Sequence, residues 1–302
     1  MSLIRVILIL CCIPFFGFSQ SFWESDTSYN KNRVIGSTVG LGVGWSGSMI
    51  ALSQVWYKDS WNGEFQFFND GQEWLQMDKV GHAYTGYHLT RNTFNVYRWS
   101  GVNRNKSLLL GSIVGFGYLA NLEIFDGFSE DWGFSWWDIA ANTAGAGFFV
   151  GQEMLWQEQR LLMKFSASLS PYAQYRPEVL GSSIPERILK DYNGQTYWIS
   201  ASPQSFTEKL AFLPPWLALS AGYSVDGKLH GMDNSFQISQ NGSLKTYFAQ
   251  RQFLLSLDVD FERIPTKSPF LITVFKALNH LKVPFPTIIF TPSAVDFRGI
   301  YF

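Results

Sequence analysis

The sequence predicts an α+β protein in which a bundle of four helices is followed by an antiparallel β-rich region. Three observations lead to this prediction. Several long apolar runs in the first half are rich in Gly and Ala, as in helices that pack closely. Beyond about residue 163, apolar and polar residues alternate as they do in strands. The chain also starts with an apolar segment that is typical of exported proteins.

The composition favours contact with a membrane and argues against a nucleic-acid binder. Only 16% of the 302 residues are charged, below the quarter or so that is usual in soluble domains, and 17% are aromatic. Aromatic rings are favoured where apolar and wet regions meet. The formal net charge of −1 provides no basic surface for nucleic acid. We therefore expect membrane lipid or other envelope components as partners, and the sequence identifies no protein partner.

Residues 1–19 are predicted to be a secretory signal peptide. Arg5 gives a short positive start, residues 6–18 are apolar but too few for a comfortable membrane span, and small residues precede a cleavage point after Ser19. The alternative is an uncleaved anchor that would hold the protein in the inner membrane. Cleavage predicts an exported protein of the outer membrane or the periplasm.

Both cysteines lie inside this predicted signal. A mature chain without Cys11 and Cys12 would have no disulfide, no thiolate metal site and no catalytic cysteine. Residues 8–10, which precede Cys11, include no small residue, so lipid attachment to a cysteine is not expected either.

Residues 20–160 are predicted to form a helical domain. Its first segment, 34–55, has no charged residue and is long enough for a spanning or fully buried helix, with a Gly-rich β-hairpin as the alternative. Each Gly weakens a helix by about 1 kcal/mol relative to Ala, so a helix here predicts that another backbone packs closely against it. The glycines concerned are Gly36, Gly40, Gly42, Gly44 and Gly47.

Three further helices are expected in this domain. One runs over 78–98 and ends near Gly101, and an apolar one runs over 107–122. Ser135 is a candidate N-cap for a fourth helix that continues to about residue 159. Small residues within the last two predict close contacts between helices.

Residues 161–302 are predicted to form a β-rich envelope domain. Alternating runs at 217–225 and 253–261 are close in length to a tilted barrel strand, which needs about nine to eleven residues. The antiparallel region could therefore be barrel-like, of the outer-membrane type. Asp226-Gly227 is a hairpin signal. Residues 270–281 have helical spacing instead.

A few ionisable and polar residues in the predicted helices indicate one polar centre. Asp78 and His82 are four residues apart on one helix face, and Asp138 and Asn142 repeat that spacing. Glu123 lies near the end of the third helix. A carboxylate facing lipid at mid-depth would cost about 2.5–3.5 kcal/mol, and convergence across the bundle avoids most of this. We therefore expect the five side chains to line one spot.

These five residues form a candidate catalytic site. Carboxylates with an imidazole can hold a divalent metal or activate a water, and a His beside an Asp can act as a general base. The spacing identifies neither a metal nor a cofactor. Structural roles stay open as well, with Asp78 as an N-cap, Asp138 as a first-turn acid, Asn142 as an interhelical hydrogen-bonding residue and His82 as a core histidine.

Aromatic residues gather before the fourth predicted helix. Trp132, Trp136 and Trp137, with neighbouring Gly and Phe residues, form an aromatic-rich elbow. Such an elbow could anchor the protein at a membrane interface, bind a lipid or glycan chain, or pack in the core.

The order of these motifs carries a resemblance to known families. Asp78-Lys79-x-x-His82, then Glu123, then residues 133–135 (Gly-Phe-Ser), then Asp138-x-x-x-Asn142-x-x-Gly145 resembles the YfiM family of periplasmic lipoproteins, which has no established biochemical role. The pattern at 78–145 is also similar to the VanZ-like membrane family, which is linked to glycopeptide-antibiotic tolerance. The resemblance covers about residues 34–160. Lipoprotein anchoring does not carry over, because a convincing lipid-attachment motif is absent.

The β-rich extension has a resemblance of its own. It resembles segments of outer-membrane proteins, and the terminal Phe302 resembles the assembly signal of outer-membrane barrels. This resemblance implies insertion by that route.

Three hypotheses for function follow. The first is a structural or accessory protein of the cell envelope with a buried Asp/His/Glu/Asn centre. The second is an envelope hydrolase that acts on lipid or cell-wall material through His82 and the neighbouring carboxylates. The third is a binding module for an envelope partner, which predicts an exposed aromatic patch on the β half.

Overall fold

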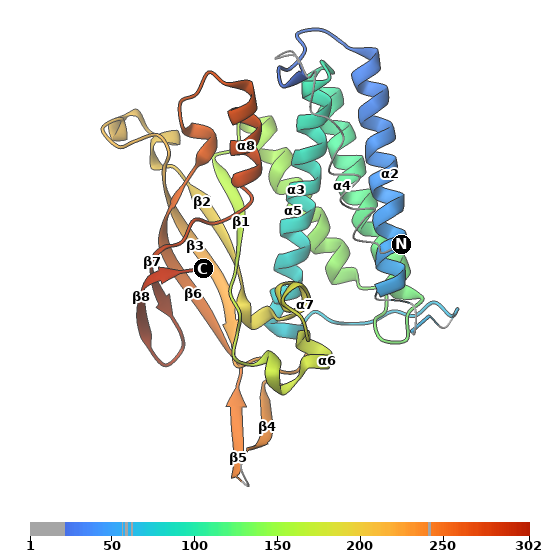
Figure 1. Ribbon diagram of the computed structural model, residues 1–302, viewed down its shortest axis with the longest axis vertical. Helices are drawn as coiled ribbons and strands as arrows, with labels where there is room; N and C mark the ends of the chain where they lie inside the picture. Colours follow the sequence, from blue (N-terminus) through green and yellow to red (C-terminus); the bar gives the residue numbers. More distant parts are fainter. Residues whose placement is uncertain (1–21, 56, 58–59, 62, 241–242) are drawn as a thin grey trace, which may run out of the picture.

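The computed structural model describes residues 22–55, 57, 60–61, 63–240 and 243–302. The predicted signal peptide, 1–19, lies outside the described residues. Four long helices lie on one side of the molecule and a curved sheet on the other (Figure 1). The α+β prediction is therefore confirmed.

The four helices match the predicted segments closely. They are α2 (Lys31–Val55), α3 (Met77–Trp99), α4 (Arg104–Gly127) and α5 (Trp136–Leu155). Side-chain caps fix two of their starts: Asn103 Oδ1 accepts from Lys106 N at 2.9 Å, and Ser135 Oγ accepts from Asp138 N at 3.1 Å. The Gly-rich first segment is thus a helix and not the alternative β-hairpin.

Helix α3 forms the centre of the helical half, packed between α4 and α5. Small residues make the approach possible. A Cβ on Gly145 of α5 would lie 1.9 Å from the Ala83 carbonyl oxygen of α3, and one on Gly111 of α4 would lie 2.7 Å from that of Thr90. The predicted close contacts of these two helices are present.

Helix α2 differs from its prediction. None of its five glycines would bring a Cβ within 4 Å of a neighbouring atom, so no backbone of the described residues packs closely on them. Helix α2 instead lies beside α3 and α4 (Figure 1) and is attached through polar side chains. The packed unit is therefore α3, α4 and α5, with α2 on its outer side.

The β half contains a six-stranded antiparallel sheet in the order β1-β2-β3-β6-β7-β8. Its strands are β1 (Leu161–Ala167), β2 (Gln195–Ala201), β3 (Leu217–Asp226), β6 (Gln250–Val259), β7 (Phe285–Phe290) and β8 (Val295–Tyr301). Strands β4 (Ser235–Gln240) and β5 (Ser243–Phe248) form a separate hairpin that projects from one end (Figure 1). Because β3 pairs with β6, the predicted hairpin directly after Asp226-Gly227 is wrong.

The six strands do not close into a barrel within the described residues. The edge strand β1 meets the chain ahead of β7 at one isolated bridge, between Phe165 and Leu281. The sheet is curled enough that Tyr301 of β8 reaches β2, where its hydroxyl lies 2.9 Å from Thr196 Oγ1. The sheet is therefore open in its strand pairing but strongly curved.

Short helices lie in the connections between strands, except for η2, which directly precedes α3. They are α6 (Pro177–Leu180), α7 (Ile184–Lys190), α8 (Pro269–Leu278), η2 (Glu73–Gln76), η3 (Ala173–Tyr175), η4 (Tyr192–Gly194), η5 (Pro203–Ser205), η6 (Glu208–Leu210) and η7 (Phe261–Arg263). Helix α8 confirms the helical spacing predicted at 270–281.

The two halves share their apolar core. Tyr87 of α3 and Phe149 of α5 pack with Met163 of β1, and Met77 packs with Val225 of β3. This contact holds the first turn of α3 against the β half and so positions the polar residues that follow Met77.

Candidate functional site

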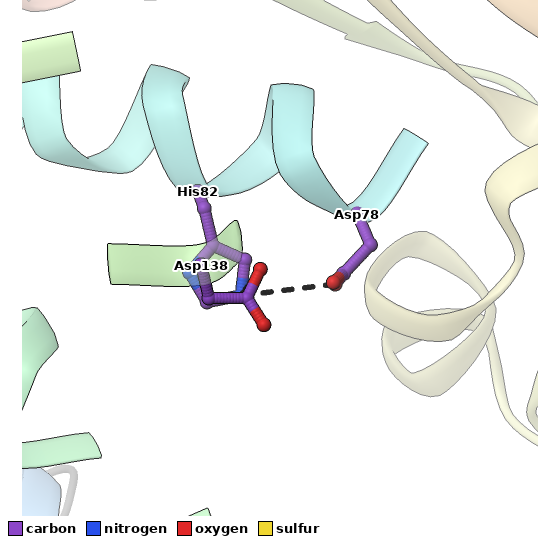
Figure 2. A group of neighbouring side chains, drawn as sticks. All are labelled: Asp78, His82 and Asp138. Atoms are coloured by element: carbon purple, nitrogen blue, oxygen red, sulfur yellow. Dashed lines mark ion pairs between the residues drawn. The ribbon is translucent and has the colours of Figure 1, made fainter. Parts of the chain in front are cut away.

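The predicted polar centre lies where α3 and α5 begin. Asp78 and His82 project from α3 and Asp138 projects from α5 toward them (Figure 2). His82 Nε2 lies 3.5 Å from Asp138 Oδ1 and 3.8 Å from Asp78 Oδ1. The cap formed by Ser135 sets the start of α5 and thereby the position of Asp138.

Glu123 and Asn142 complete the set that the sequence predicts. His82 Nδ1 lies 3.0 Å from Asn142 Oδ1 and 3.7 Å from Glu123 Oε1. Both residues are buried, with 0% and 1% of their surfaces exposed for Asn142 and Glu123. The structure thus brings all five residues to one place, while their catalytic use stays a prediction.

A lysine that the sequence analysis quoted only as part of a motif lies at the heart of the centre. Lys79 Nζ donates to Asp70 Oδ2 at 2.5 Å, to Asp78 Oδ2 at 2.7 Å and to Asp138 Oδ1 at 2.6 Å. An ammonium group has three donors, so these carboxylates use all of them. Asp70 was missed as a site residue, and its only sequence signal is the Asp70-Gly71 turn.

Neighbouring hydroxyls orient the carboxylates. Tyr192 of η4 donates its hydroxyl to Asp78 Oδ1 at 2.7 Å, which connects the β half to the centre. Ser135 Oγ donates to Asp70 Oδ1 at 2.5 Å, while its backbone N–H faces Glu123 Oε2 at 3.4 Å. Asp78 lies in the first turn of α3 and does not cap it, because the N-cap position belongs to Gln76, which makes no side-chain cap bond.

Two polar atoms of the centre have no hydrogen-bond partner among the described residues, Glu123 Oε1 and Asn142 Nδ2. Such buried atoms are rare, because an unpaired polar atom in the interior costs free energy. Glu123 and Asn142 therefore keep unused hydrogen-bonding capacity beside His82.

The charges of the centre follow from burial and from Lys79. Burial opposes ionisation of Asp78, but His82 and Lys79 outweigh it and lower its pKa to about 2. Burial also disfavours the charged form of Lys79, yet Asp78 and Asp138 outweigh it and raise the pKa of Lys79. For Asp138, burial dominates and raises its pKa to about 7. Asp138 is therefore the more readily protonated of the two acids.

Asp78, His82 and Asp138 are the residues that could hold a divalent metal, since one ligand atom from each lies within 4.8 Å of the others. Their oxygens are already engaged, because Lys79 bonds both acids and Tyr192 bonds Asp78. A cation of the protein itself thus neutralises the two carboxylates that a metal would need. The donor set fits an internal ion network better than a metal site.

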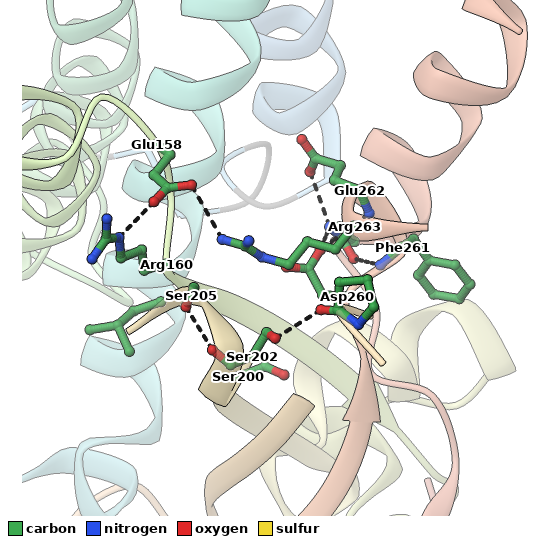
Figure 3. Close-up of polar contacts among 12 residues, drawn as sticks. Glu158, Arg160, Ser200, Ser202, Ser205, Asp260, Phe261, Glu262 and Arg263 are labelled. Carbon is green, nitrogen blue, oxygen red and sulfur yellow. Dashed lines mark hydrogen bonds and ion pairs between the residues drawn. The ribbon is translucent and has the colours of Figure 1, made fainter. Parts of the chain in front are cut away.

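Other polar groups and cavities lie away from this centre. Beyond the far end of α5, Glu158 accepts from Arg160 at 2.6 Å and from Arg263 at 3.4 Å (Figure 3). A cavity of about 300 Å³ lies there, beside Arg91. Neither this cavity nor a second one beside Trp99 is lined by any of the five predicted residues.

The predicted aromatic elbow is at the surface. Trp132, Trp136 and Trp137 are 50%, 66% and 56% exposed, so core packing is wrong for them. The ring of Trp136 stacks on that of Phe67 with an interplanar angle of 11°. The elbow therefore remains a candidate for contact with a membrane interface or a lipid or glycan chain.

A comparison with known protein families matches the part of the chain that contains the polar centre. Residues 64–152 match a family described as a predicted periplasmic lipoprotein (DUF2279). This segment is less than a third of the chain, and it contains Asp78, His82, Glu123, Asp138 and Asn142. No curated protein and no solved structure matches the chain. The match supports an exported, periplasmic protein of the cell envelope.

Proposed function

We propose that this chain is an accessory protein of the cell envelope, held at the outer membrane, whose polar centre is structural and not catalytic. The observation that carries the proposal is the ammonium group of Lys79, which bonds three carboxylates at once. The motif order at 78–145, similar to the YfiM and VanZ-like families, supports an envelope role. The alternating strands of the β half support the outer membrane as the location.

The network joins parts of the chain that lie far apart in sequence. Through Lys79 it ties the loop at Asp70 to α3 and α5, and through Tyr192 it ties them to the β half. Removing one partner of a buried pair leaves an uncompensated charge and costs about 3–5 kcal/mol. Lys79 and its carboxylate partners are therefore expected to be needed for the stability of the fold, whether or not the centre touches a substrate.

Complementation of a strain that lacks the gene tests the proposal. Lys79→Met should lower the amount of folded protein in the envelope, and the strain should lose detergent resistance in proportion. His82→Ala should leave both the amount of protein and the resistance close to wild type, because His82 supplies none of the three bonds to Lys79. Loss of resistance in His82→Ala at normal abundance would contradict a structural role.

A hydrolase acting on lipid or cell-wall material is the second candidate. The observation in its favour is that the His82 side chain is 22% exposed beside two carboxylates and the unpartnered atoms of Glu123 and Asn142. In this case His82 would be the general base, and Asp78 would orient it. His82→Ala and His82→Gln would then abolish activity while leaving folding unchanged. The structural role predicts instead that His82→Ala keeps its function.

A further inference from the structure

The helical half exposes an apolar surface on its outer side. We define the helical face as the outward residues of α2 and α4, which include Val39, Val43, Ile50, Leu109 and Ile113, each at least 56% exposed. No charged residue occurs in 34–55 or in 107–122. Large contiguous apolar surfaces of this kind are rare on soluble monomers.

The inner side of α2 is polar. Thr38 Oγ1 lies 3.0 Å from the Tyr97 hydroxyl, Trp45 Nε1 donates to Asn121 Oδ1 at 3.2 Å, and Ser48 Oγ accepts from the Tyr118 hydroxyl at 3.0 Å. Helix α2 thus turns hydrogen-bonding side chains toward its neighbours and aliphatic ones outward. This is the reverse of a helix on a water-soluble protein, and it is the arrangement of helices that associate within lipid.

The sheet shows the same reversal. We define the sheet face as the outward residues of β3, β6, β7 and β8. They include Leu219, Leu257, Leu255, Ile288 and Phe297, all at least 40% exposed. These residues are neighbours across the strands: Leu219 pairs with Leu257, Leu255 with Ile288, and Ile288 with Phe297. They form one apolar surface across four strands.

The opposite face of the same sheet is buried, and it carries a polar network beside the apolar cluster of Trp198, Leu254 and Ile289. Lys164 of β1 and Asp258 of β6, both 0% exposed, form an ion pair at 3.0 Å, and Ser200 Oγ of β2 donates to Asp258 Oδ2 at 2.6 Å. Ser220 donates to Ser200 at 2.9 Å. Strands with polar residues inside and apolar residues outside match those of outer-membrane proteins.

The length of the helical face fits a bilayer. Helices α2 and α4 have 25 and 24 residues, or about 36–38 Å of helix, against a hydrocarbon core of about 30 Å. Both are long and apolar enough to cross a membrane, and only 6% and 22% of their most apolar stretches are buried. A helix that is apolar because it lies in a protein core would be mostly buried, which excludes that explanation here.

Exposed aromatic rings mark both ends of the helical face. Near the end of α2 lie Trp61, Phe67, Trp132 and Trp136, which are 50% to 66% exposed. Near its beginning, Phe22 and Phe270 are 37% and 49% exposed, and both pack against Trp23 with ring centroids 5.2 and 5.1 Å away. Aromatic belts at two levels are the pattern of proteins that meet both interfaces of a membrane.

We infer that the helical face and the sheet face both contact the acyl chains of lipids, so that the protein stands in the bilayer with α2 and α4 as spanning helices. The inference rests on the proposed location at the outer membrane and goes beyond it, because a protein held at a membrane need not enter it. The two faces lie on opposite sides of the molecule (Figure 1). A second copy bound to one face would leave the other exposed, whereas hydrocarbon covers both.

Fluorescence quenching by brominated lipid tests this directly. Single cysteines replace Val43 on the helical face, Leu255 on the sheet face and Ser243 on the projecting β4–β5 hairpin, in a full chain with Cys11→Ala and Cys12→Ala. Each variant carries a bimane label and is reconstituted into dioleoylphosphatidylcholine vesicles with or without brominated acyl chains. Ile113→Cys and Ile288→Cys provide a second position on each face should either first variant fail to fold.

The expected result is strong quenching at Val43→Cys and Leu255→Cys and little at Ser243→Cys. Quenching at one face alone would overturn the inference, since a protein surface or water would then cover the other. Absence of quenching at both faces would overturn it as well. Cell fractionation tests the proposed location separately. If the protein pellets with outer membranes but shows no quenching, it is a peripheral protein: the proposed location is then supported and the lipid-facing inference is wrong.

Discussion

Lys79 is the residue of the polar centre that bonds three carboxylates at once. Its ammonium group faces Asp70, Asp78 and Asp138, each at 2.7 Å or less. Without this cation, three carboxylates would lie close together in a largely buried place where water screens their repulsion poorly. The stability of the helical half should therefore depend strongly on this one side chain.

Lys79→Met should lower the free energy of unfolding by about 3–5 kcal/mol, the range found when one partner of a buried pair is removed. Urea titration in detergent micelles measures the change. Lys245→Met is the matched control, because Lys245 is exposed on β5, and its effect should stay within about 0.5 kcal/mol. Equal losses in the two variants would show that the Lys79 network contributes nothing special.

Acid should weaken the protein through Asp78. Its pKa falls from 3.8 to about 2 in the folded protein, so the folded state favours the carboxylate. That contribution, about 2 kcal/mol, is fully present above pH 4 and is lost as the pH falls toward 2. Wild-type protein should thus lose about 2 kcal/mol more than Asp78→Asn between pH 5 and pH 2 in urea titrations, and parallel losses would contradict the assignment.

Helical spacing predicted much of the centre at the level of single residues. Two residues four apart share a helix face, which was enough to pair Asp78 with His82 and Asp138 with Asn142. Tyr192 could not be predicted in this way, because it reaches Asp78 from a short helix 114 residues along the chain. The path of such connections depends on tertiary packing, for which a single sequence carries no periodic signal.

Glycines act differently in the different helices. In α5, Gly145 allows the backbone of α3 to approach, and a Cβ there would overlap the Ala83 carbonyl oxygen. Gly147 is two residues away on the same helix, and a Cβ there would meet nothing within 4 Å. The pair separates the packing role of a glycine from its general effect on helix stability.

Gly145→Ala should push α3 and α5 apart and destabilise the protein by about 1–3 kcal/mol, as overpacked substitutions do. Gly147→Ala should be neutral or should stabilise by up to about 1 kcal/mol, because Ala is the better helix former. Thermal unfolding in micelles, followed by circular dichroism, measures both. Destabilisation of equal size in the two variants would mean that the close approach of α3 is not what Gly145 provides.

At the level of elements, long apolar runs predicted the helices at 34–55 and 107–122, and start and stop signals such as Asp78, Gly101 and Ser135 predicted the other two. The role of α2 was predicted wrongly, since small residues suit both a tight helix contact and a surface that nothing covers. The pairing of β3 with β6 was missed because the Asp226-Gly227 turn is a local signal, and it opens onto the inserted β4–β5 hairpin. Register across such an insertion is fixed by packing and not by the turn.

The molecule as a whole has broad apolar surfaces on both its helical and its sheet sides, and it buries polar networks beside its apolar core. The sequence predicted membrane contact from its aromatic and charge content, but it could not show which side of each strand faces outward. Alternation gives two faces without saying which is buried. Only the structure places Leu255 outside and Asp258 inside on the same strand.

Membrane fractionation of the tagged full chain, with and without an alkaline carbonate wash, tests the lipid-facing arrangement most directly. The protein should remain in the outer-membrane pellet after the wash, because carbonate removes proteins held by charge but not those embedded through apolar faces. Release into the supernatant, or recovery with soluble periplasmic proteins, would show that the helical face and the sheet face are covered by something other than lipid.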